Sequence, residues 1–531
     1  MNFARRHGIL IIILCFSSFW MLRNVSQPWN GLEGSEGVLT SSIARNYLRY
    51  GVFSLRFGQA INPEPVSDMS DLSYYQHHPP LLPLLTSGMF ALLGESEAAA
   101  RLLPIVFSLG SILLVFILAK KAYNEHVALL AAFFFATFPA VLFFARAPDS
   151  MAPSTFLMLL CMWFYQRIFD EKGVWNLLGV FGSLGAGLLL DWPVYLLVPF
   201  LSLHCWWYGG RVRFRKTLIF GMPVLAFFVF GVFQYQSYRV DPESLTHLLN
   251  QGKVYMGLIG KESPLAAEYE EAKISFTAFQ YGKTAASRLD LLFSYPLLLL
   301  GTLGMWVARS DRSAQGRLVF VLLGVALAYC VIFYRSVYIH VWHTYIFSAP
   351  LAILGALGAI DVFSRNYKNP GLSRRAAVLV VALALTGALP RLWSLHQIQV
   401  KVLPGDRHEQ ATFLENVGNE VRARSKPPDL ILTNLASLPG MRKALPYYAE
   451  RKIVYGVENS ERLSAFLESA PRQRNVRFLM WRAPEQGKGD NELYRQLMMA
   501  GTVEELVIGE HRFLWFTCDL RTLIRRAVRS R

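Results

Sequence analysis

The sequence predicts a polytopic α-helical membrane protein of about eleven transmembrane helices, followed by a soluble α/β domain. Of its 531 residues, 53% are hydrophobic and only 17% are charged, which is too apolar for a soluble surface. The apolar residues gather in runs of roughly 16–20, close to the length that crosses about 30 Å of hydrocarbon. After residue 393 these runs stop and shorter strand-like and helical patterns begin.

Eleven apolar runs predict the spans. They cover residues 8–23, 100–119, 126–145, 151–167, 174–190, 193–208, 217–236, 289–308, 317–334, 345–362 and 376–393. The first run follows the basic start "MNFARRHG" and has no small-x-small cleavage site after it, so we expect a retained span that enters from the cytoplasm.

The charges between the runs predict the orientation. Every even-numbered connection is basic, as shown by Lys120 and Lys121, Arg167 and Lys172, Arg211–Lys216, Arg309–Arg317 and Arg365–Arg375. By the positive-inside rule these connections and the N-terminus are cytoplasmic. The predicted outer segments are 24–99, 146–150, 191–192, 237–288, 335–344 and 394–531. Counting 80–94 as a span would reverse every later loop, so we expect that run to be a helix at the outer interface.

Two domains follow from this pattern. Residues 1–393 form the membrane domain, with a large first outer loop at 24–99. Residues 394–531 alternate strand-like runs ("PDLILTNL", "KIVYGV", "VRFLMW", "EELVIG") with helical stretches at 409–424 and 459–469, which predicts an α/β domain on the outer side. The net charge of +16 suits anionic membrane lipids, and the absence of a basic helix or stacking motif argues against nucleic acid.

Ionisable side chains at the outer mouth of a membrane protein are candidates for function. In the first loop, Glu33 and Glu36 precede a helical segment, 38–50, that carries Arg45. They serve equally well as carboxylates at a helix N-terminus. The same loop ends in "YYQHHPPLLPLL", with His77 and His78 before two prolines.

Two later outer turns add further candidates. "FFARAPDSMAPS" contains Arg146 and Asp149, although Asp149 could simply cap the next helix while Arg146 extends to the interface. "YRSVYIHVWHTY" contains Arg335 and His343, which also fit an interfacial belt of aromatic residues and histidines.

The order of these motifs resembles a known family. "SEGVLTSSIARNYLRYG", "YYQHHPPLLPLL", "RLLP" and "RAPDSMAPS" together resemble the polyprenyl-phosphate-sugar-dependent glycosyltransferases of the GT-C superfamily. The nearest branch (glycosyltransferase family 39-like) holds protein O-mannosyltransferases and the lipid A aminoarabinose transferase. The resemblance covers mainly residues 24–200 and implies a GT-C-like transmembrane catalytic domain.

The resemblance also implies an activity. A sugar moves with inversion from a polyprenyl-phosphate donor to a lipid, glycan or protein acceptor, on the outer face of the inner membrane. The family's first acidic residue matches Glu36, where glutamate replaces the usual aspartate and Glu33 competes for the role; its second matches Asp149. His77 and His78 stand where some relatives carry an acidic and a basic residue.

The chemistry requires a base for the acceptor hydroxyl and positive charge for the departing phosphate. The catalytic candidates are therefore Glu36, Asp149 and Glu33. The candidates for substrate binding are His77, His78, Arg45, Arg146, Arg335 and His343. A divalent ion (Mg, Mn or Zn) held by His77 and Asp149 is an alternative source of positive charge.

Two other classes of function stay open on the sequence. A transporter or flippase of a lipid-linked sugar also needs a cavity open to lipid, and paired discontinuous helices or repeat halves would favour it. A non-catalytic membrane scaffold would be favoured by degenerate carboxylates.

Overall fold

The computed structural model describes residues 3–29, 31–170, 173–210, 212–264, 269–365, 370–397, 407–427, 429–435, 439–457, 459–469, 476–482, 491–508 and 511–518. The chain divides into two compact units, which we call the membrane unit and the α/β unit. The membrane unit comprises Met1–Val25, Gly51–Gln59 and Tyr75–Ile398. The α/β unit comprises Ser26–Tyr50, Ala60–Tyr74 and Gln399–Arg531. The segment 24–99, predicted as the first outer loop, is thus divided between the two.

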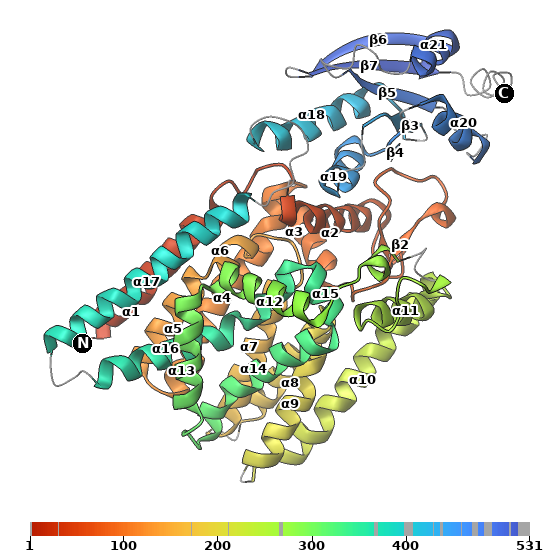
Figure 1. Ribbon diagram of the computed structural model, residues 1–531. Helices are drawn as coiled ribbons and strands as arrows, with labels where there is room; N and C mark the ends of the chain where they lie inside the picture. Colours follow the sequence, from red (N-terminus) through yellow and green to blue (C-terminus); the bar gives the residue numbers. More distant parts are fainter. Residues whose placement is uncertain are drawn as a thin grey trace. The chain divides into compact units, whose positions relative to one another are not determined.

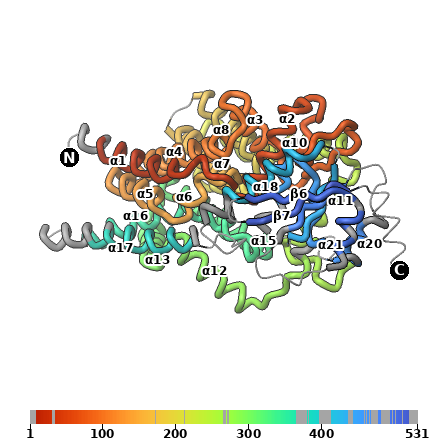
Figure 2. The backbone as a smooth tube through the Cα atoms, turned by 90° about the horizontal axis from the view of Figure 1, so that it is seen from above, coloured from red at the N-terminus to blue at the C-terminus, as the bar shows by residue number. Residues whose placement is uncertain are grey.

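The membrane unit is helical throughout (Figure 1). Its elements are α1 (Phe3–Leu22), α3 (Leu81–Leu93), α4 (Glu97–Ala122), α5 (Glu125–Thr137), α6 (Pro139–Phe144), α7 (Met151–Ile168), α8 (Val174–Leu188), α9 (Pro193–Tyr208), α10 (Arg215–Val240), α11 (Ser244–Tyr255), η3 (Glu270–Lys273), α12 (Ala278–Phe293), α13 (Tyr295–Ala308), α14 (Ala314–Ile332), α15 (Tyr334–Ile339), η4 (Val341–Phe347), α16 (Ser348–Arg365) and α17 (Pro370–Gln397). Figure 2 shows α1 beside α4 and α5, which it contacts.

A helix overlaps each of the eleven predicted runs, but the count of eleven spans is not confirmed. Within the described residues, four helices are long and apolar enough to cross a membrane, and a fifth span is added if α12 and α13, which meet at 97°, count as one. Several of the other helices are short. Pro139, for example, ends α5 by forcing Phe138 into an extended conformation with ψ 131°.

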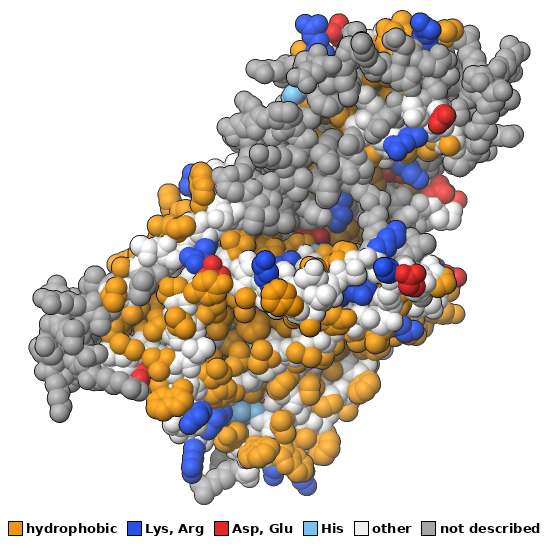
Figure 3. Space-filling model, viewed as in Figure 1, with side chains coloured by type: hydrophobic (Ala, Val, Ile, Leu, Met, Phe, Trp, Pro, Cys, Tyr) orange, Lys and Arg blue, Asp and Glu red, His pale blue; other side chains and the backbone are white. Residues whose placement is uncertain are grey.

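Side-chain exposure separates peripheral helices from central ones. In α10, only 28% of the most apolar 18-residue stretch is buried. In Val341–Ser364, 72% of the corresponding stretch is buried. The exposed residues of α10 are apolar, as Phe220, Phe227 and Phe228 illustrate. Hydrophobic side chains cover the visible face of the membrane unit (Figure 3). A water-soluble protein rarely exposes so much contiguous apolar surface, so the membrane unit has the surface of an integral membrane protein.

The run at 80–94 is a helix, as predicted. The helix α3 has 13 residues, too few to cross a bilayer at about 1.5 Å per residue. It begins after Pro80 and ends at Gly94, whose φ of 80° suits glycine. Its first amide, that of Leu81, donates to the carbonyl of Leu189 at 3.1 Å. Its position at the interface stays a prediction.

The α/β unit contains a five-stranded sheet of order β4-β3-β5-β7-β6 (Figure 1). The strands are β3 (Leu430–Thr433), β4 (Lys452–Val454), β5 (Val476–Arg482), β6 (Gly501–Ile508) and β7 (His511–Cys518). The first three strands pair in parallel, and β7 runs antiparallel to β5 and β6. The helices are α2 (Gly31–Tyr50), α18 (Arg407–Arg424), α19 (Pro439–Ala449), α20 (Ser460–Ser469) and α21 (Asn491–Ala500). Leu432, Phe478 and Phe516 are central in its apolar core.

The four strand-like runs predicted from the sequence are strands, and β7 was not predicted. The helix α2 packs on α19 although about 400 residues separate them, as the Arg49–Glu450 contact shows with a separation of 401. Trp29 is fully buried against α2, where Gly37 leaves room for its ring: a Cβ at Gly37 would lie 2.3 Å from a Trp29 ring atom. The short strands β1 (Gln59–Ala60) and β2 (Tyr74–Tyr75) pair where the chain passes between the units.

Candidate functional site

A buried carboxylate, Asp191, organises the polar cluster of the membrane unit. Its side chain is completely buried and its two oxygens accept three hydrogen bonds. Oδ2 accepts from the Ser150 hydroxyl at 2.5 Å, while Oδ1 accepts from the Trp192 amide at 2.7 Å and lies 3.0 Å from Nδ1 of His78. A buried carboxylate is tolerated only when it is paired in this way. Asp191 therefore fixes the His78 ring.

The backbone of the two histidines is held as well. Nε1 of Trp192 donates to the carbonyl of His77 at 2.9 Å, and Nε2 of Gln59 donates to the carbonyl of His78 at 2.6 Å. The prolines that follow then lead the chain into α3. The local order of "HHPP" thus depends on residues from two other segments.

Asp149 lies in the turn directly before α7, next to Ser150. Its Oδ1 accepts from the Met151 amide at 2.7 Å, so one oxygen caps the helix. Arg146 is only 6% exposed and does not extend to the surface. Its Nη1 donates to the carbonyl of Arg23 at 3.0 Å, where it closes the C-terminal end of α1. The turn brings Arg146, Asp149 and the Asp191 cluster into one region.

His77 has a neutral ring at physiological pH. Burial lowers its pKa to about 4, and like charge on His78 and His247 adds to the effect. Of the two histidines, His78 has the carboxylate partner and is the better candidate for the cationic role, which stays a prediction.

The lowered pKa of His77 predicts a stability that depends on pH. Between pH 6.5 and about 4 the unfolded chain binds a proton at His77 that the folded protein does not, so stability is lost as the pH falls through this window. His77→Gln should reduce the drop in unfolding temperature between pH 7 and pH 4.5, measured on the purified protein in detergent. His126→Gln, at an exposed position, should keep the full drop. Equal drops in both variants would contradict this account.

His343 lies in η4, which contacts α6 and α7, the helices on either side of the Asp149 turn. Both ring nitrogens of His343 meet hydroxyls: Nδ1 that of Tyr329 at 2.8 Å and Nε2 that of Ser336 at 3.0 Å. Arg335 is also buried, and its Nη1 donates to the carbonyl of Ile259 at 2.7 Å. These contacts are structural, and the substrate-binding roles of both residues stay predictions.

Glu36 and Arg45 belong to the α/β unit. Glu36 Oε1 lies 3.8 Å from Nζ of Lys443. The Arg45 guanidinium lies 4.0 Å from the centre of the Tyr447 ring, and its Nη1 donates to the Tyr447 carbonyl at 3.0 Å. The Glu33 side chain lies outside the described residues. Glu36 and Asp149 are thus in different units, whereas His78 and Asp149 share one.

Among the described residues, the side chains do not form a ready metal site. In the part of the chain that the structure describes, no group of three or more His, Cys, Asp or Glu side chains is placed to hold a metal ion. The predicted pair of His77 and Asp149 therefore lacks a third protein ligand among these residues.

Sequence reasoning did not assign roles to Asp191 and Ser150. The only signal for Asp191 was a carboxylate in a two-residue connection between apolar runs, where an ionisable group is expensive. Nothing in the sequence indicated that it would meet His78, 113 residues away.

Comparisons with known proteins bear on the fold. Residues 77–235 match the family model described as dolichyl-phosphate-mannose-protein mannosyltransferase. No curated protein matches the chain significantly. Among solved structures, ArnT from Cupriavidus metallidurans is similar with a TM-score of 0.60 and 14% identity, over 97% of this chain and 99% of that one.

Two further structures share the fold. The oligosaccharyltransferase AglB from Archaeoglobus fulgidus is similar with a TM-score of 0.57 and 13% identity, over 97% of this chain and 74% of that one. The arabinofuranosyltransferase AftD from mycobacteria reaches a TM-score of 0.51 at 13% identity, over 98% of this chain and 40% of that one. The matched family segment, 77–235, contains His78, Asp149 and Asp191.

Proposed function

Because the chain carries a domain of the dolichyl-phosphate-mannose-protein mannosyltransferase family within the GT-C glycosyltransferase fold, we propose that it is an inverting glycosyltransferase. It moves a sugar from a polyprenyl-phosphate donor to a lipid, glycan or protein acceptor. Relatives support the donor class: a structure of ArnT is bound to undecaprenyl phosphate, and AglB is in complex with a dolichol-phosphate and an inhibitory peptide.

The observation that carries this proposal is the Asp191 cluster beside Asp149. An inverting transfer breaks the bond between the anomeric carbon and the phosphate oxygen while the acceptor oxygen attacks from the opposite face. The departing phosphate takes the bonding electrons and needs positive charge, and the acceptor hydroxyl must lose a proton. His78, oriented by Asp191, meets the first need when protonated, and a carboxylate at Asp149 or Glu36 meets the second.

A metal ion is not part of this scheme. One structure of the Archaeoglobus fulgidus oligosaccharyltransferase is a complex with Zn and sulfate, but the described residues of this chain include no group of three or more His, Cys, Asp or Glu side chains placed to hold a metal ion. The positive charge in the scheme comes from the protein's own side chains.

The proposal includes an orientation. The basic connections between the runs favour a cytoplasmic N-terminus in the inner membrane, with the site and the α/β unit on the outer face. A transporter of lipid-linked sugars is less well supported, because only one bent helix pair, α12 and α13, occurs among the described helices rather than a symmetric set of two.

Right-side-out membrane vesicles test activity and orientation together. Short-chain polyprenyl-phosphate donors carrying hexoses or pentoses are added outside, and lipids, glycans and proteins are analysed by mass spectrometry. We expect a new glycosidic bond only in vesicles that contain the protein, and none in inverted vesicles given the donor outside. Lys452→Cys, exposed on β4, should react with an impermeant maleimide in the right-side-out vesicles, compared with the unsubstituted protein. Movement of intact donor without transfer would favour the transporter.

A further inference from the structure

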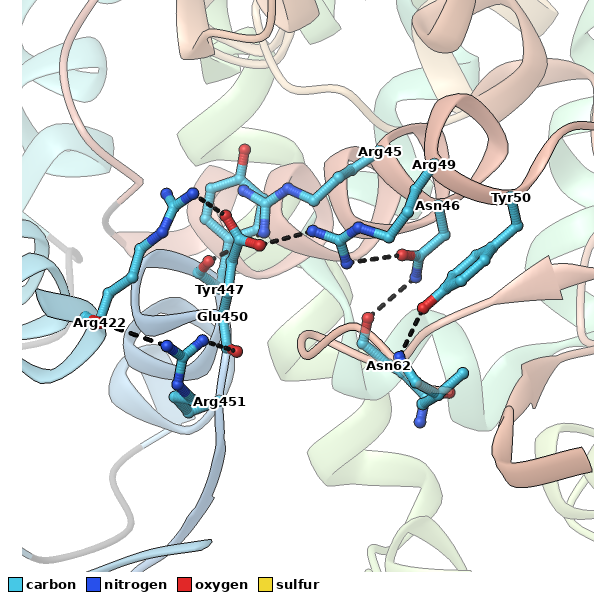
Figure 4. A network of polar contacts seen from close by, with 10 residues as sticks. Arg45, Asn46, Arg49, Tyr50, Asn62, Arg422, Tyr447, Glu450 and Arg451 are labelled. Atoms are coloured by element: carbon cyan, nitrogen blue, oxygen red, sulfur yellow. Dashed lines mark hydrogen bonds and ion pairs between the residues drawn. The ribbon is translucent and has the colours of Figure 1, made fainter. Parts of the chain in front are cut away.

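The helix α2, which carries Glu36, is fastened to α19 by a series of polar contacts within the α/β unit. Figure 4 shows part of this network, with Arg45, Arg49 and Glu450 facing one another. Besides the Lys443–Glu36 and Tyr447–Arg45 contacts, the Trp29 amide donates to the Tyr448 hydroxyl at 2.7 Å. Residues of α19 therefore contact α2, and Trp29 just before it, at several points.

Glu450 makes the shortest of these contacts and uses both of its carboxylate oxygens. Its Oε2 lies 2.5 Å from Nη2 of Arg49, and its Oε1 lies 2.8 Å from Nη2 of Arg422 on α18. The side chains of Arg49 and Glu450 are only 21% and 11% exposed, so solvent screens this ion pair little. One carboxylate thus joins α2 to α18.

The backbone at Glu450 indicates that this carboxylate has a specific use. Glu450 directly follows α19 with a φ of 48°, in the left-handed region where a helix end normally has glycine or asparagine. A glutamate there is strained, and the strain persists because both carboxylate oxygens are paired and Nη1 of Arg451 donates to its carbonyl at 2.8 Å.

The α2 side of the contact is fixed in turn. Nη1 of Arg49 donates to Oδ1 of Asn46 at 3.3 Å, and Nδ2 of Asn46 donates to the carbonyls of Ala60 and Asn62 at 2.9 Å each. The Val66 amide donates to the Tyr50 hydroxyl at 2.7 Å. The C-terminal half of α2 therefore has one set of partners, which sets its register and rotation.

We infer that Glu450 is a positioning residue for the transfer reaction: through Arg49 it holds α2 in the register that presents Glu36 to the reaction. Lys443, on the same α19, contacts Glu36 itself. This inference rests on the proposed function, since it takes Glu36 as a catalytic candidate. In this way the α/β unit contributes to the reaction by positioning α2, and Glu450 itself need not contact the substrate.

Glu450→Gln tests the inference, because it keeps the size of the side chain and removes its charge. We expect faster hydrogen exchange of the α2 amides at 38–50 in the full-length protein, since the ion pair no longer resists local opening. We also expect kcat to fall about tenfold or more while the donor KM stays within about twofold, given the usual strength of charge-assisted hydrogen bonds.

A matched control is present in the same unit. Glu504 on β6 pairs with Arg424 on α18 at 3.4 Å, its side chain is 58% exposed, and this ion pair does not involve α2. Glu504→Gln should leave both α2 exchange and kcat unchanged. Reversing all three charges, with Arg49→Glu, Arg422→Glu and Glu450→Arg, should recover part of the lost kcat and slow α2 exchange again, which a general loss of folding would not do. If Glu450→Gln does not fold, Arg49→Lys, which keeps the charge but loses the forked contact, replaces it.

The outcomes separate the two proposals. Unchanged α2 exchange in Glu450→Gln overturns the inference whatever the activity. Faster α2 exchange with unchanged kcat, in a protein that Glu36→Gln inactivates, also overturns it. Faster α2 exchange in a protein that stays active with Glu36→Gln supports the attachment of α2 by Glu450 but overturns the catalytic role of Glu36 in the proposed function.

Discussion

Asp149→Asn is expected to lower the rate of sugar transfer by about 10²–10⁴-fold, the usual contribution of a positioned general base. The variant should still fold, because the asparagine Oδ1 can accept the hydrogen bond that Asp149 now accepts from the Met151 amide. The loss would therefore come from the missing negative charge and proton acceptor, and not from an open turn before α7. Initial rates in right-side-out vesicles, at saturating donor, provide the measurement.

Asp170→Asn is a suitable control for Asp149→Asn. Asp170 follows the C-terminal end of α7, whereas Asp149 precedes its N-terminal end. The Asp170 carboxylate is exposed and pairs with Lys121. Its replacement should leave the rate within about twofold, as is usual for surface positions. Near-normal transfer by Asp149→Asn would return this carboxylate to a helix-capping role and remove it from the mechanism.

Glu36→Gln is expected to reduce transfer to a similar extent, whereas Glu33→Gln should retain it. The resemblance that identified Glu36 depends on the spacing to "ARNYLRYG", and a one-turn displacement would instead select Glu33. The amide keeps the length of the side chain, so the comparison isolates the charge. Transfer rates of the two variants, with hydrogen exchange of α2 as a check on folding, distinguish the alternatives.

The opposite pattern, with Glu33→Gln inactive and Glu36→Gln active, would assign the base to Glu33. Full activity in both variants would contradict a catalytic role for this helix. The same measurements would also show whether the glutamate in place of the family's usual aspartate is functional.

Features set by local pattern could be predicted from the sequence. Apolar runs located the helices of the membrane unit, including α3 within the run 80–94, and short strand-like runs located β3, β4, β5 and β6. The strand β7, "HRFLWFTC", was not predicted; it lies inside the sheet between β5 and β6, with Phe513 and Phe516 fully buried.

Features set by distant partners could not be predicted. Asp191 and His78 meet across 113 residues, and Arg49 and Glu450 across 401. In both cases the local sequence showed only a charged residue in a loop or on a helix face. Which groups pair is decided by packing between segments, and neither hydrophobic period nor motif spacing contains that information.

The division of the first outer loop has a consequence for biosynthesis. Because α2 and Trp29 belong to the α/β unit, the first part of that unit leaves the ribosome hundreds of residues before α19 and the sheet that complete it. Pairing of segments so far apart in the chain is slow, because the chain loses conformational entropy in bringing them together before their contacts stabilise the fold. During this interval α2 lacks the surface of α19 on which it packs in the folded unit, so we expect the nascent chain to expose apolar surface until α19 has been made.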